Sequence, residues 1–354
     1  MKTRRYPLGT RFLEWVDFVG YLTPRRIWNL VQLRISYALS LMLRAPVHRG
    51  MPASISIEPA SGCNLHCPEC PTGLGHLSRK KSLMSGEDFF SVIDQVKKSA
   101  IAVSLYFQGE PFIHPGLIGM ISYASKHKLF STVSTNGQFL PGIDMEELVM
   151  SGLNRLIVSA DGITQLTYET YRIGGSLEKL MQGLKKIAEA KKKLHSKKPL
   201  LILQFLVMRH NQYELPLLEE WAVSAGADAV LLKSPQIDSL EGSGDILPTI
   251  ERFNRYTPGE NGRWKVKSDL PDRCWRMWHG SIIDVNGDIL PCCFDKDAGF
   301  VIGNIQQQRI HEVWHSRTYD KFREGVLSNR KSIAMCTNCT ENLEISASEL
   351  KFVR

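Results

Sequence analysis

The feature that most constrains the fold is a regular alternation of β-type and helical runs between residues 53 and 235. The expected strands are Ser54–Glu58, Ala102–Phe107, Ser131–Thr135, Arg155–Ala160, Leu200–Val207 and Ala229–Lys233. The expected helices lie near Gly86–Lys98, Pro115–His127, Asp144–Met150, Ser176–Lys193 and Tyr213–Ala225. This order predicts an α/β fold with a parallel sheet and right-handed crossovers, either doubly wound or closed into an incomplete barrel. In both cases ligands bind at the carboxyl ends of the strands.

Three cysteines follow the first expected strand: Cys63, Cys67 and Cys70. Thiolates are preferred ligands of zinc and of iron–sulfur clusters. A structural zinc site normally has four protein ligands, and His66 lies between two of the cysteines, where it can hardly reach the same ion. Three thiolates suit a 4Fe–4S cluster whose fourth iron stays open to a small molecule. We favour the cluster, and structural zinc or disulfides remain the alternatives.

Polar and glycine-containing loops follow the next three strands as well. Gln108-Gly109-Glu110-Pro111 follows the second strand, Asn136-Gly137 the third and Asp161-Gly162 the fourth. A glycine lets the backbone approach a ligand closely, and a proline fixes the turn. Because these loops meet at the edge of the sheet that carries the cysteines, they predict one shared site there.

Residues 53–233 resemble the core domain of the radical S-adenosylmethionine (SAM) superfamily. The three-cysteine loop is the hallmark of that family, Gly109-Glu110-Pro111 matches its Gly-Glu motif, and the likeness extends over Ser134–Gly137 and Val158–Gly162. The resemblance implies an incomplete (β/α)6 TIM-like barrel with a 4Fe–4S cluster on Cys63, Cys67 and Cys70 and with SAM on the open iron. The reduced cluster would cleave SAM to a 5′-deoxyadenosyl radical that abstracts hydrogen from a substrate.

The resemblance also implies a set of SAM contacts, namely Gly109, Glu110, Pro111, Ser134, Asn136, Ser159 and Arg172. Backbone carbonyls around Gly109 would receive the amino group, and the serine and asparagine side chains would contact the ribose or the carboxylate. Arg172 would pair with the carboxylate through a bidentate contact. An ordinary surface position fits Arg172 equally well.

Five further cysteines lie between residues 274 and 339. Four thiolates would close a site, formed by Cys274, one of the pair Cys292 and Cys293, Cys336 and Cys339. Two β-type runs around Asn286-Gly287 predict a hairpin with a type I′ turn. By themselves, four cysteines that end in Cys-x2-Cys fit structural zinc as well as they fit a cluster.

The residues around these cysteines resemble the auxiliary-cluster extension of radical SAM enzymes, of the SPASM and shorter "twitch" types. The matching segments are Asn286-Gly287-Asp288, Pro291-Cys292-Cys293, Gly303-Asn304-Ile305 and Val313-Trp314. The full SPASM pattern has more cysteines than this region, so the resemblance implies one auxiliary 4Fe–4S cluster on Cys274, Cys292, Cys336 and Cys339. Cys293 would then lie beside that cluster or near the substrate.

The resemblance predicts a radical SAM oxidoreductase in which the auxiliary cluster accepts an electron from the substrate radical. Relatives with this architecture mature peptides and proteins or dehydrogenate small alcohols, so the expected partners are a peptide or small-molecule substrate and an external one-electron donor such as flavodoxin or ferredoxin. Asp161, Asp284 and Asp288 are weak candidates for a general base, and turn or capping roles fit each of them as well. The alternatives are a zinc-stabilised binding module without catalysis, or a radical enzyme acting on a lipid-linked or nucleic-acid substrate.

The positive charge of the chain is concentrated at one end. Residues 1–50 carry nine basic and two acidic residues, a net charge of +7 out of +8 for the whole chain. The nearly neutral remainder disfavours a nucleic-acid partner. Apolar residues recur at helical spacing among these arginines, and Thr23 and Pro24 suit the start of a helix. This basic amphipathic arm either packs on the core or lies on an anionic membrane surface.

We therefore expect five segments: a helical arm (1–50), a partial barrel (51–235), a linker or capping loop (236–272), a small cysteine-rich α+β domain (273–345) and a tail (346–354). No apolar run has the length of a membrane span, and we see no signal peptide with a cleavage site. We expect a cytoplasmic protein, with peripheral membrane association through residues 1–50 as an open alternative.

Overall fold

The fold is built on one curved sheet with ten strands, in the order β11-β10-β9-β1-β2-β3-β4-β5-β6-β12. This computed structural model describes residues 18–242, 244–339 and 348–353. The six expected strands are β1 (Ser54–Ile57), β2 (Ala102–Ser104), β3 (Phe130–Thr135), β4 (Arg155–Ser159), β5 (Leu200–Leu206) and β6 (Ala229–Lys233). They pair in parallel in chain order, which confirms the partial-barrel prediction.

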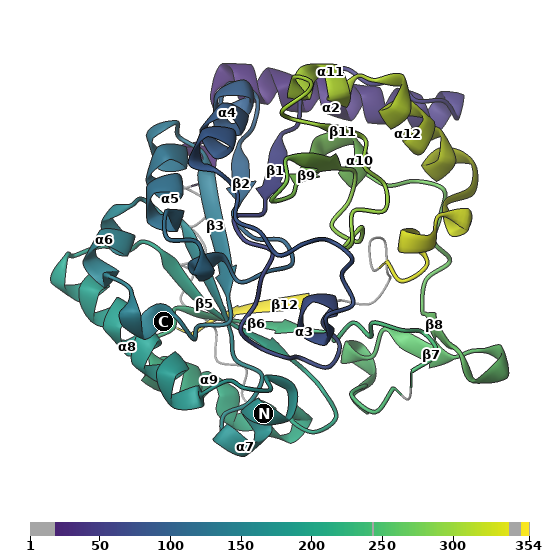
Figure 1. The fold of residues 1–354 in the computed structure, drawn as a ribbon. Coiled ribbons are helices and arrows are strands. Elements are labelled where there is room, and N and C mark those ends of the chain that lie inside the picture. Colours follow the sequence, from purple (N-terminus) through teal and green to yellow (C-terminus); the bar gives the residue numbers. More distant parts are fainter. Residues whose placement is uncertain (1–17, 243, 340–347, 354) are drawn as a thin grey trace.

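Helices cover the outer side of this sheet (Figure 1). They are α4 (Gly86–Val96), α5 (Leu117–Lys126), α6 (Met145–Met150), α7 (Gln165–Tyr171), α8 (Leu177–Lys193) and α9 (Leu215–Ala225). In α4, the Ser85 hydroxyl accepts from the Asp88 amide, and the apolar residues Phe89, Val92 and Ile93 are buried against the sheet. The N-cap and the spacing of the buried residues explain why this segment is helical and which side faces inward.

The cysteine-rich region continues the same sheet instead of forming a sheet of its own. Strand β9 (Gly280–Ile283) pairs in parallel with β1, and β10 (Asp288–Leu290) and β11 (Gly303–Asn304) extend that edge antiparallel. At the other edge, β12 (Ser348–Phe352), in the segment expected to be a tail, pairs antiparallel with β6. Both edges of the partial barrel are thereby covered, which satisfies backbone groups that an open edge would expose.

The turn between β9 and β10 differs from the expected type I′ turn. Gly287 has a φ of 80°, whereas Asn286 is not among the residues with positive φ. The Gly287 amide donates to the Asp284 carbonyl at 3.0 Å, and the Asp284 amide donates to the Asp288 carbonyl at 3.0 Å. The prediction of the hairpin is confirmed and that of the turn type is wrong, because the loop is a type I turn followed by one left-handed glycine.

Residues 236–272, expected to be a linker or a capping loop, contain structure of their own. A small hairpin pairs β7 (Tyr256–Pro258) with β8 (Trp264–Val266). Ile237, Leu247, Tyr256 and Val266 form a separate apolar cluster beneath it. Three helices complete the C-terminal part: α10 (Arg276–His279), α11 (Ile310–Trp314) and α12 (Arg317–Asn329).

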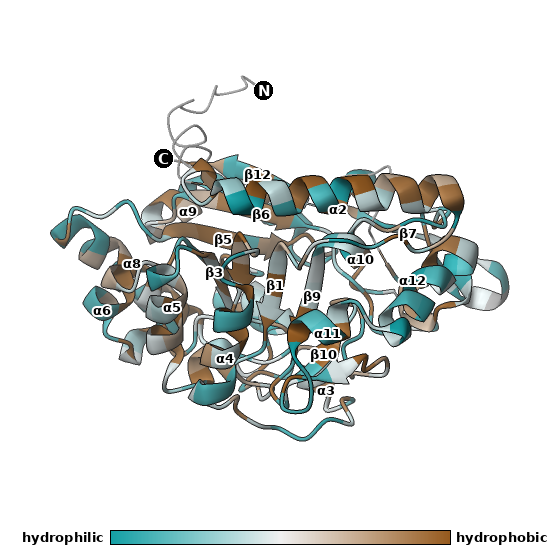
Figure 2. Ribbon diagram, turned by 90° about the horizontal axis from the view of Figure 1, so that it is seen from above, coloured by the Kyte–Doolittle hydropathy of each residue, from teal (hydrophilic) through white to brown (hydrophobic). Residues whose placement is uncertain are grey.

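The described part of the N-terminal arm is dominated by α2 (Pro24–Leu43), which lies along the outside of the molecule (Figure 2). The Thr23 hydroxyl accepts from the Arg26 amide at 3.4 Å, which confirms the expected N-cap. The buried side of α2 is mostly polar and consists of Arg26, Asn29, Leu33, Ser36 and Ser40. Arg26 is 2% exposed, and its guanidinium donates to four backbone carbonyls, two of them at the end of α5.

Residues 1–17 of the arm lie outside the described residues. Among the described helices, none has the length and the apolar character needed to cross a membrane.

Candidate functional site

The three-cysteine loop follows β1 and ends in the short helix α3 (Pro71–Leu74). Cys67 is 5% exposed and packs with Leu65, Tyr171 and Met208, while Cys63 and Cys70 contact the same cluster. The three thiols of the loop are therefore brought together. The His66 ring is exposed and faces the Gly73 carbonyl at 3.4 Å, away from that cluster.

Gly109 brings the loop after β2 against this cysteine loop. A Cβ atom at Gly109 would lie 2.1 Å from the carbonyl oxygen of Ala60 and 2.7 Å from that of Gly62. The neighbouring Glu110 amide donates to the Gly62 carbonyl at 2.8 Å. Glycine is therefore required here by the close approach of two backbones.

The Glu110 side chain fixes the end of β3. Its carboxylate accepts hydrogen bonds from the Phe112 amide at 3.0 Å, the Thr135 hydroxyl at 2.7 Å and the Asn136 amide at 2.7 Å. Burial raises the pKa of Glu110, and these donors oppose that rise. Asn136 in turn donates to the Cys63 sulfur at 3.6 Å and to the Asn64 side chain at 2.8 Å, so two of the expected SAM contacts are tied to the cysteine loop.

Arg172 is held against the cysteines by Asp161. Its Nε and Nη2 atoms both lie 2.6 Å from Asp161 Oδ2, and Nη1 donates to the Cys67 sulfur at 3.6 Å. Asp161 is fully buried and also accepts from the Leu206 amide at 2.7 Å. Burial raises the pKa of the Cys67 thiol to about 11, and the Arg172 cation opposes that rise. Arg172 is thus not a surface residue, and Asp161 positions it.

The two serines expected to contact SAM lie at the ends of β3 and β4. Ser159 is buried, and its hydroxyl accepts from Gln204 at 3.4 Å. Ser134 is half-buried. Pro111 opens a short 3-10 turn directly after Glu110. All seven expected SAM contacts therefore lie on loops or strand ends around one edge of the sheet.

Four of the five C-terminal cysteines line one narrow cavity, with Arg330 and several apolar side chains. They are Cys274, Cys292, Cys336 and Cys339. The nearby apolar residues Met277 and Val326 belong to the same buried cluster as Cys274. Cys293 lies instead in the lining of a larger, neighbouring cavity.

Arg330 was not anticipated from the sequence. It is 1% exposed, and its Nη2 donates to the Cys339 sulfur at 3.2 Å while Nη1 donates to the Arg273 carbonyl at 2.9 Å. A buried guanidinium of this kind balances the charge of thiolates, as Arg172 does beside Cys67. An arginine shortly before a Cys-x2-Cys pair is the only signal that sequence inspection offers for it.

The larger cavity has a volume of about 750 Å³ and shares Phe294 with the narrow cavity of the four C-terminal cysteines. Cys67, Cys70 and Arg172 line it from the barrel side, and Cys293 and Phe294 line it from the hairpin side. Gln204 and Leu206, at the end of β5, form part of its wall. It lies at the carboxyl ends of the strands, where α/β folds of this kind bind their ligands.

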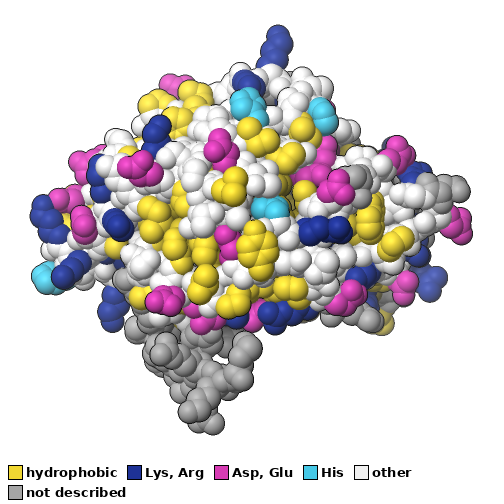
Figure 3. All heavy atoms as spheres, turned by 90° about the horizontal axis from the view of Figure 1, so that it is seen from below, with side chains coloured by type: hydrophobic (Ala, Val, Ile, Leu, Met, Phe, Trp, Pro, Cys, Tyr) yellow, Lys and Arg dark blue, Asp and Glu magenta, His cyan; other side chains and the backbone are white. Residues whose placement is uncertain are grey.

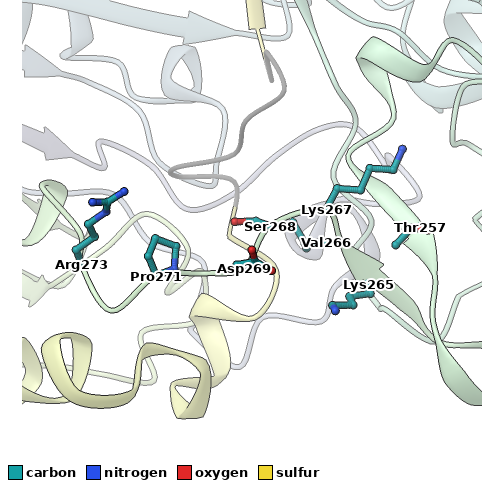
Figure 4. Close-up of a pocket in the computed structure, with 8 residues that line it drawn as sticks. All are labelled: Thr257, Lys265, Val266, Lys267, Ser268, Asp269, Pro271 and Arg273. Atoms are coloured by element: carbon teal, nitrogen blue, oxygen red, sulfur yellow. The ribbon is translucent and has the colours of Figure 1, made fainter.

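A second hollow, of about 480 Å³, lies along the β7–β8 hairpin (Figure 4). Its lining includes Lys265, Lys267 and Arg273 but no residue that the sequence pointed to. We therefore place the candidate site in the larger cavity between the cysteines.

A second network missed by sequence inspection joins the barrel to the hairpin. Glu58, fully buried at the end of β1, receives Arg79 Nη1 at 2.7 Å and Nη2 at 3.2 Å. Arg79 also contacts Asp284 at 3.2 Å, and Glu58 accepts from the Gln108 amide at 3.1 Å. The network therefore links the cysteine loop, the loop after β2 and the turn after β9.

The other two candidate bases are held in the hairpin. The Asp284 carboxylate accepts from the amides of Asn286 and Asp288, and the Asp288 carboxylate accepts from Asn304 at 2.8 Å. Neither belongs to the described lining of the 750 Å³ cavity. These contacts support the turn and capping roles.

The donor set fits iron–sulfur clusters. Within the described ranges, no three His, Cys, Asp or Glu side chains surround a position for a single metal ion. Three thiols share one loop and four share one cavity, and each group has a buried arginine whose charge offsets thiolates. Gly109 provides the close backbone approach that a ligand beside the first group requires.

Two family models match the chain. The radical SAM superfamily model covers residues 57–203, and the SPASM model, an iron–sulfur cluster-binding domain, covers residues 274–340. The matched segments contain both cysteine groups.

The matches to curated relatives extend over more than three quarters of this chain and of each relative. The PqqA peptide cyclase of Gluconobacter oxydans is 26% identical over 294 residues, which is 77% of this chain and 79% of that protein. The tungsten-containing aldehyde ferredoxin oxidoreductase cofactor-modifying protein of Pyrococcus furiosus is 22% identical over 313 residues, 80% of this chain and 86% of that protein.

Among solved structures, Streptococcus suis SuiB bound to its precursor peptide SuiA superimposes with a TM-score of 0.61 at 15% identity. The match covers 86% of this chain and 72% of that one. At this level of identity the likeness shows a shared fold.

Proposed function

Because this chain belongs to the radical SAM superfamily and carries a C-terminal SPASM domain, we propose that it is a two-cluster enzyme that oxidises or otherwise modifies a peptide substrate. When bound, a 4Fe–4S cluster and SAM would supply the radical chemistry that removes a hydrogen atom from the substrate. The observation that carries the proposal is the 750 Å³ cavity, which has Cys67 and Cys70 in one wall and Cys293 in another. A substrate in this cavity contacts Cys67 and Cys70 on one side, and on the other side it lies beside Cys293, the chain neighbour of Cys292.

The proposed functions of the residues differ between the two ends of the cavity: one end binds SAM, and the other lies beside the auxiliary cluster. Cys63, Cys67 and Cys70 hold the cluster that binds SAM, and Arg172, positioned by Asp161, offsets the thiolate charge and contacts the SAM carboxylate. Gly109, Asn136 and the nearby serines line the approach to that cluster.

The second cysteine group serves the substrate end of the cavity. Cys274, Cys292, Cys336 and Cys339 would hold one auxiliary cluster, which would supply an electron acceptor on the substrate side. Four protein ligands would leave no open iron there, which favours electron transfer or a structural role over direct binding of substrate. The family assignment replaces the zinc-stabilised binding module as the interpretation of these cysteines.

A peptide is the favoured substrate class. A relative at 26% identity is a peptide cyclase, and a structural neighbour is bound to a precursor peptide. A cavity of about 750 Å³ accepts a side chain with its flanking backbone. Dehydrogenation of a small alcohol is the alternative outcome of the substrate test.

Two further partners belong to the proposal. An external one-electron donor such as flavodoxin or ferredoxin reduces the cluster for each turnover. The second partner is an anionic membrane surface, contacted through residues 1–50.

Helix α2 supports the membrane contact because its polar side faces the core and its apolar side faces solvent. Exposed fractions range from 38% to 78% for the outward residues Ile27, Trp28, Val31, Ile35, Leu39 and Met42. Arg25 and Arg34 are exposed on α2, with the Arg34 guanidinium over the Trp275 ring, Arg44 follows the last residue of the helix, and the sequence of α2 contains no acidic residue. On the face seen from below in Figure 3, by contrast, acidic and basic side chains are interspersed with apolar ones. An exposed apolar stripe bordered by arginines suits an anionic lipid surface.

Anaerobic purification and reconstitution test the proposed enzyme. We expect a brown protein with about eight irons per chain, which forms 5′-deoxyadenosine from SAM when dithionite is added. A colourless protein that binds zinc, or a brown one that leaves SAM intact, would contradict the proposal. Incubation with a peptide encoded beside the gene then tests the substrate class, and the expected product lacks two hydrogen atoms.

A further inference from the structure

Cations from four separate segments line the cavity between the two cysteine groups. Lys233 ends β6, Arg255 directly precedes β7, Arg276 opens α10 and Lys296 lies in the loop after β10. Lys233 and Lys296 both interact electrostatically with Arg255 and with Cys293. The fold thus gathers positive charge around Cys293, from residues that share no sequence motif.

In the described parts of the chain, no ion pair joins Lys233, Arg255 or Lys296 to an acidic side chain. Asp238 and Glu69 nevertheless act electrostatically on Lys296. Glu69 is the one carboxylate of the described lining, and it accepts the Asp238 amide at 2.6 Å. Asp161, which acts electrostatically on Lys233, is already paired with Arg172.

Arg255 is the most deeply placed of the set. It is 6% exposed, its guanidinium donates to the Ser234 carbonyl, and its Nε has no hydrogen-bond partner. Burial lowers the pKa of Arg255, Lys233 and Lys296, which reflects the cost of keeping a charge away from water. A buried cation without an anionic partner is expensive in folding free energy unless an anionic ligand pairs with it.

We propose that Lys233, Arg255 and Lys296 form a subsite for an anionic oxygen group of the substrate, a carboxylate or a phosphate. A guanidinium between two ammonium groups provides several donors and charge for two or three such oxygens. The inference rests on the proposed function in one respect: it takes the other seven cysteines as cluster ligands. The SAM carboxylate is a second source of the same chemistry, and we assign it instead to Arg172 beside Cys67.

The alkylation rate of Cys293 can be used to test this subsite even though the substrate is not identified. In the reconstituted holoenzyme the other seven cysteines are cluster ligands, so Cys293 is the thiol that alkylating reagents meet. Anionic iodoacetate and neutral iodoacetamide both form a thioether with loss of iodide, and they differ in charge. We expect the iodoacetate-to-iodoacetamide rate ratio at Cys293 to exceed that of glutathione by about tenfold or more, because a cationic cleft concentrates anions. Inorganic pyrophosphate should slow both reactions.

Matched variants test whether the cations cause the preference of Cys293 for iodoacetate. Lys233→Gln combined with Lys296→Gln should lower the ratio severalfold toward that of glutathione. Lys265→Gln, which removes an exposed lysine of β8 outside this cavity, should leave the ratio unchanged. The extent of alkylation at each cysteine is read by peptide mass spectrometry.

Other results would overturn the assignment. A wild-type ratio equal to that of glutathione, or no effect of pyrophosphate, means that the cavity has no anion subsite. Loss of the iodoacetate preference on addition of saturating SAM means that the cations bind the SAM carboxylate and not a substrate. Failure of the underlying two-cluster function gives a different signal, namely fewer than about eight irons per chain and alkylation at the cysteines assigned to clusters.

Discussion

Gly109 illustrates what one residue contributes to the site. The loops after β1 and β2 meet at this position with no space for a side chain, because backbone carbonyls of the cysteine loop fill it. The sequence pattern identified Gly109 as part of a motif, and the structure gives the physical reason for it. Glu110, expected to border SAM through its backbone, turns its carboxylate to the end of β3.

Replacing Gly109 with alanine should destabilise the protein by about 1–3 kcal/mol, since the added methyl group overlaps backbone atoms. SAM binding should weaken as the two loops separate. The matched control is Gly119→Ala inside α5, where a Cβ meets nothing within 4 Å. That change should stabilise the protein by about 0.5–1 kcal/mol. Urea unfolding of both variants measures the difference, and equal effects of the two would contradict the steric argument.

Cys67→Ala should abolish formation of 5′-deoxyadenosine, because the cluster that binds SAM loses a ligand. His66→Ala, in the same loop, should retain SAM cleavage because its ring faces the Gly73 carbonyl. Chromatographic detection of 5′-deoxyadenosine after reduction by dithionite distinguishes the two variants. Cleavage by the Cys67 variant at the wild-type rate would refute the ligand assignment.

At the scale of secondary structure, α2 is an amphipathic helix whose polar side faces the core and whose apolar side faces solvent. Arg26 and Asn29 anchor it by donating to backbone carbonyls, and the apolar residues remain in solvent. Sequence periodicity correctly predicted the helix and its N-cap. It could not decide which side faces the core, since that depends on the carbonyls that the barrel presents.

Ile35→Glu should weaken binding to vesicles of phosphatidylglycerol by about tenfold or more. The change removes an apolar side chain that would be buried in the lipid and adds a negative charge that the anionic headgroups repel. Binding of the wild-type protein should fall with added salt and be weaker to phosphatidylcholine. Leu166→Glu on α7, also an exposed leucine-to-acid change, serves as the control. Vesicle flotation measures binding. If Ile35→Glu instead converts a dimer to a monomer in light scattering, α2 contacts a second copy of the chain.

His48, between α2 and β1, gives the attachment of the arm a pH dependence. Burial and the nearby Arg323 cation lower its pKa from 6.5 to about 2. Below pH 6.5 the unfolded chain therefore binds a proton that the folded chain excludes, so stability is complete above that pH and falls as the pH decreases. His48→Asn should flatten the loss of stability between pH 7.5 and 5.5, whereas the exposed-site change His66→Asn should not. Urea midpoints at each pH provide the measurement.

At the scale of the whole molecule, one sheet carries both cysteine groups. Strand β9 lies beside β1, so the cysteine loop after β1 and Cys293 after β10 border the same cavity. The Glu58–Arg79–Asp284 network joins the same two regions by ion pairs. A substrate bound in this cavity would therefore lie between the cysteine loop and Cys293, that is, between the two proposed clusters.

Cys336→Ala tests whether the two ends act separately. We expect the iron content to fall from about eight to about four per chain, while part of the SAM cleavage persists because the barrel cluster is intact. Modification of the substrate should be impaired more than SAM cleavage. Iron analysis and 5′-deoxyadenosine formation on the same sample provide both readouts. Unchanged iron content would contradict the placement of an auxiliary cluster at this residue.

The local features of this protein could be predicted from its amino-acid sequence. Cysteine spacing, strand and helix periods and the loops after the strands depend on neighbouring residues, so they predicted the six parallel strands, the helices between them and the family. The folded structure was needed to show which sheet edges the C-terminal strands cover, which groups pair with Glu58 and Arg330, and which cations surround Cys293. Arg79 and Asp284, for example, are 205 residues apart in the chain. Such contacts depend on which sheet edges and which buried charged side chains lack a partner after the core has folded. A local sequence pattern contains no information about these long-range pairings.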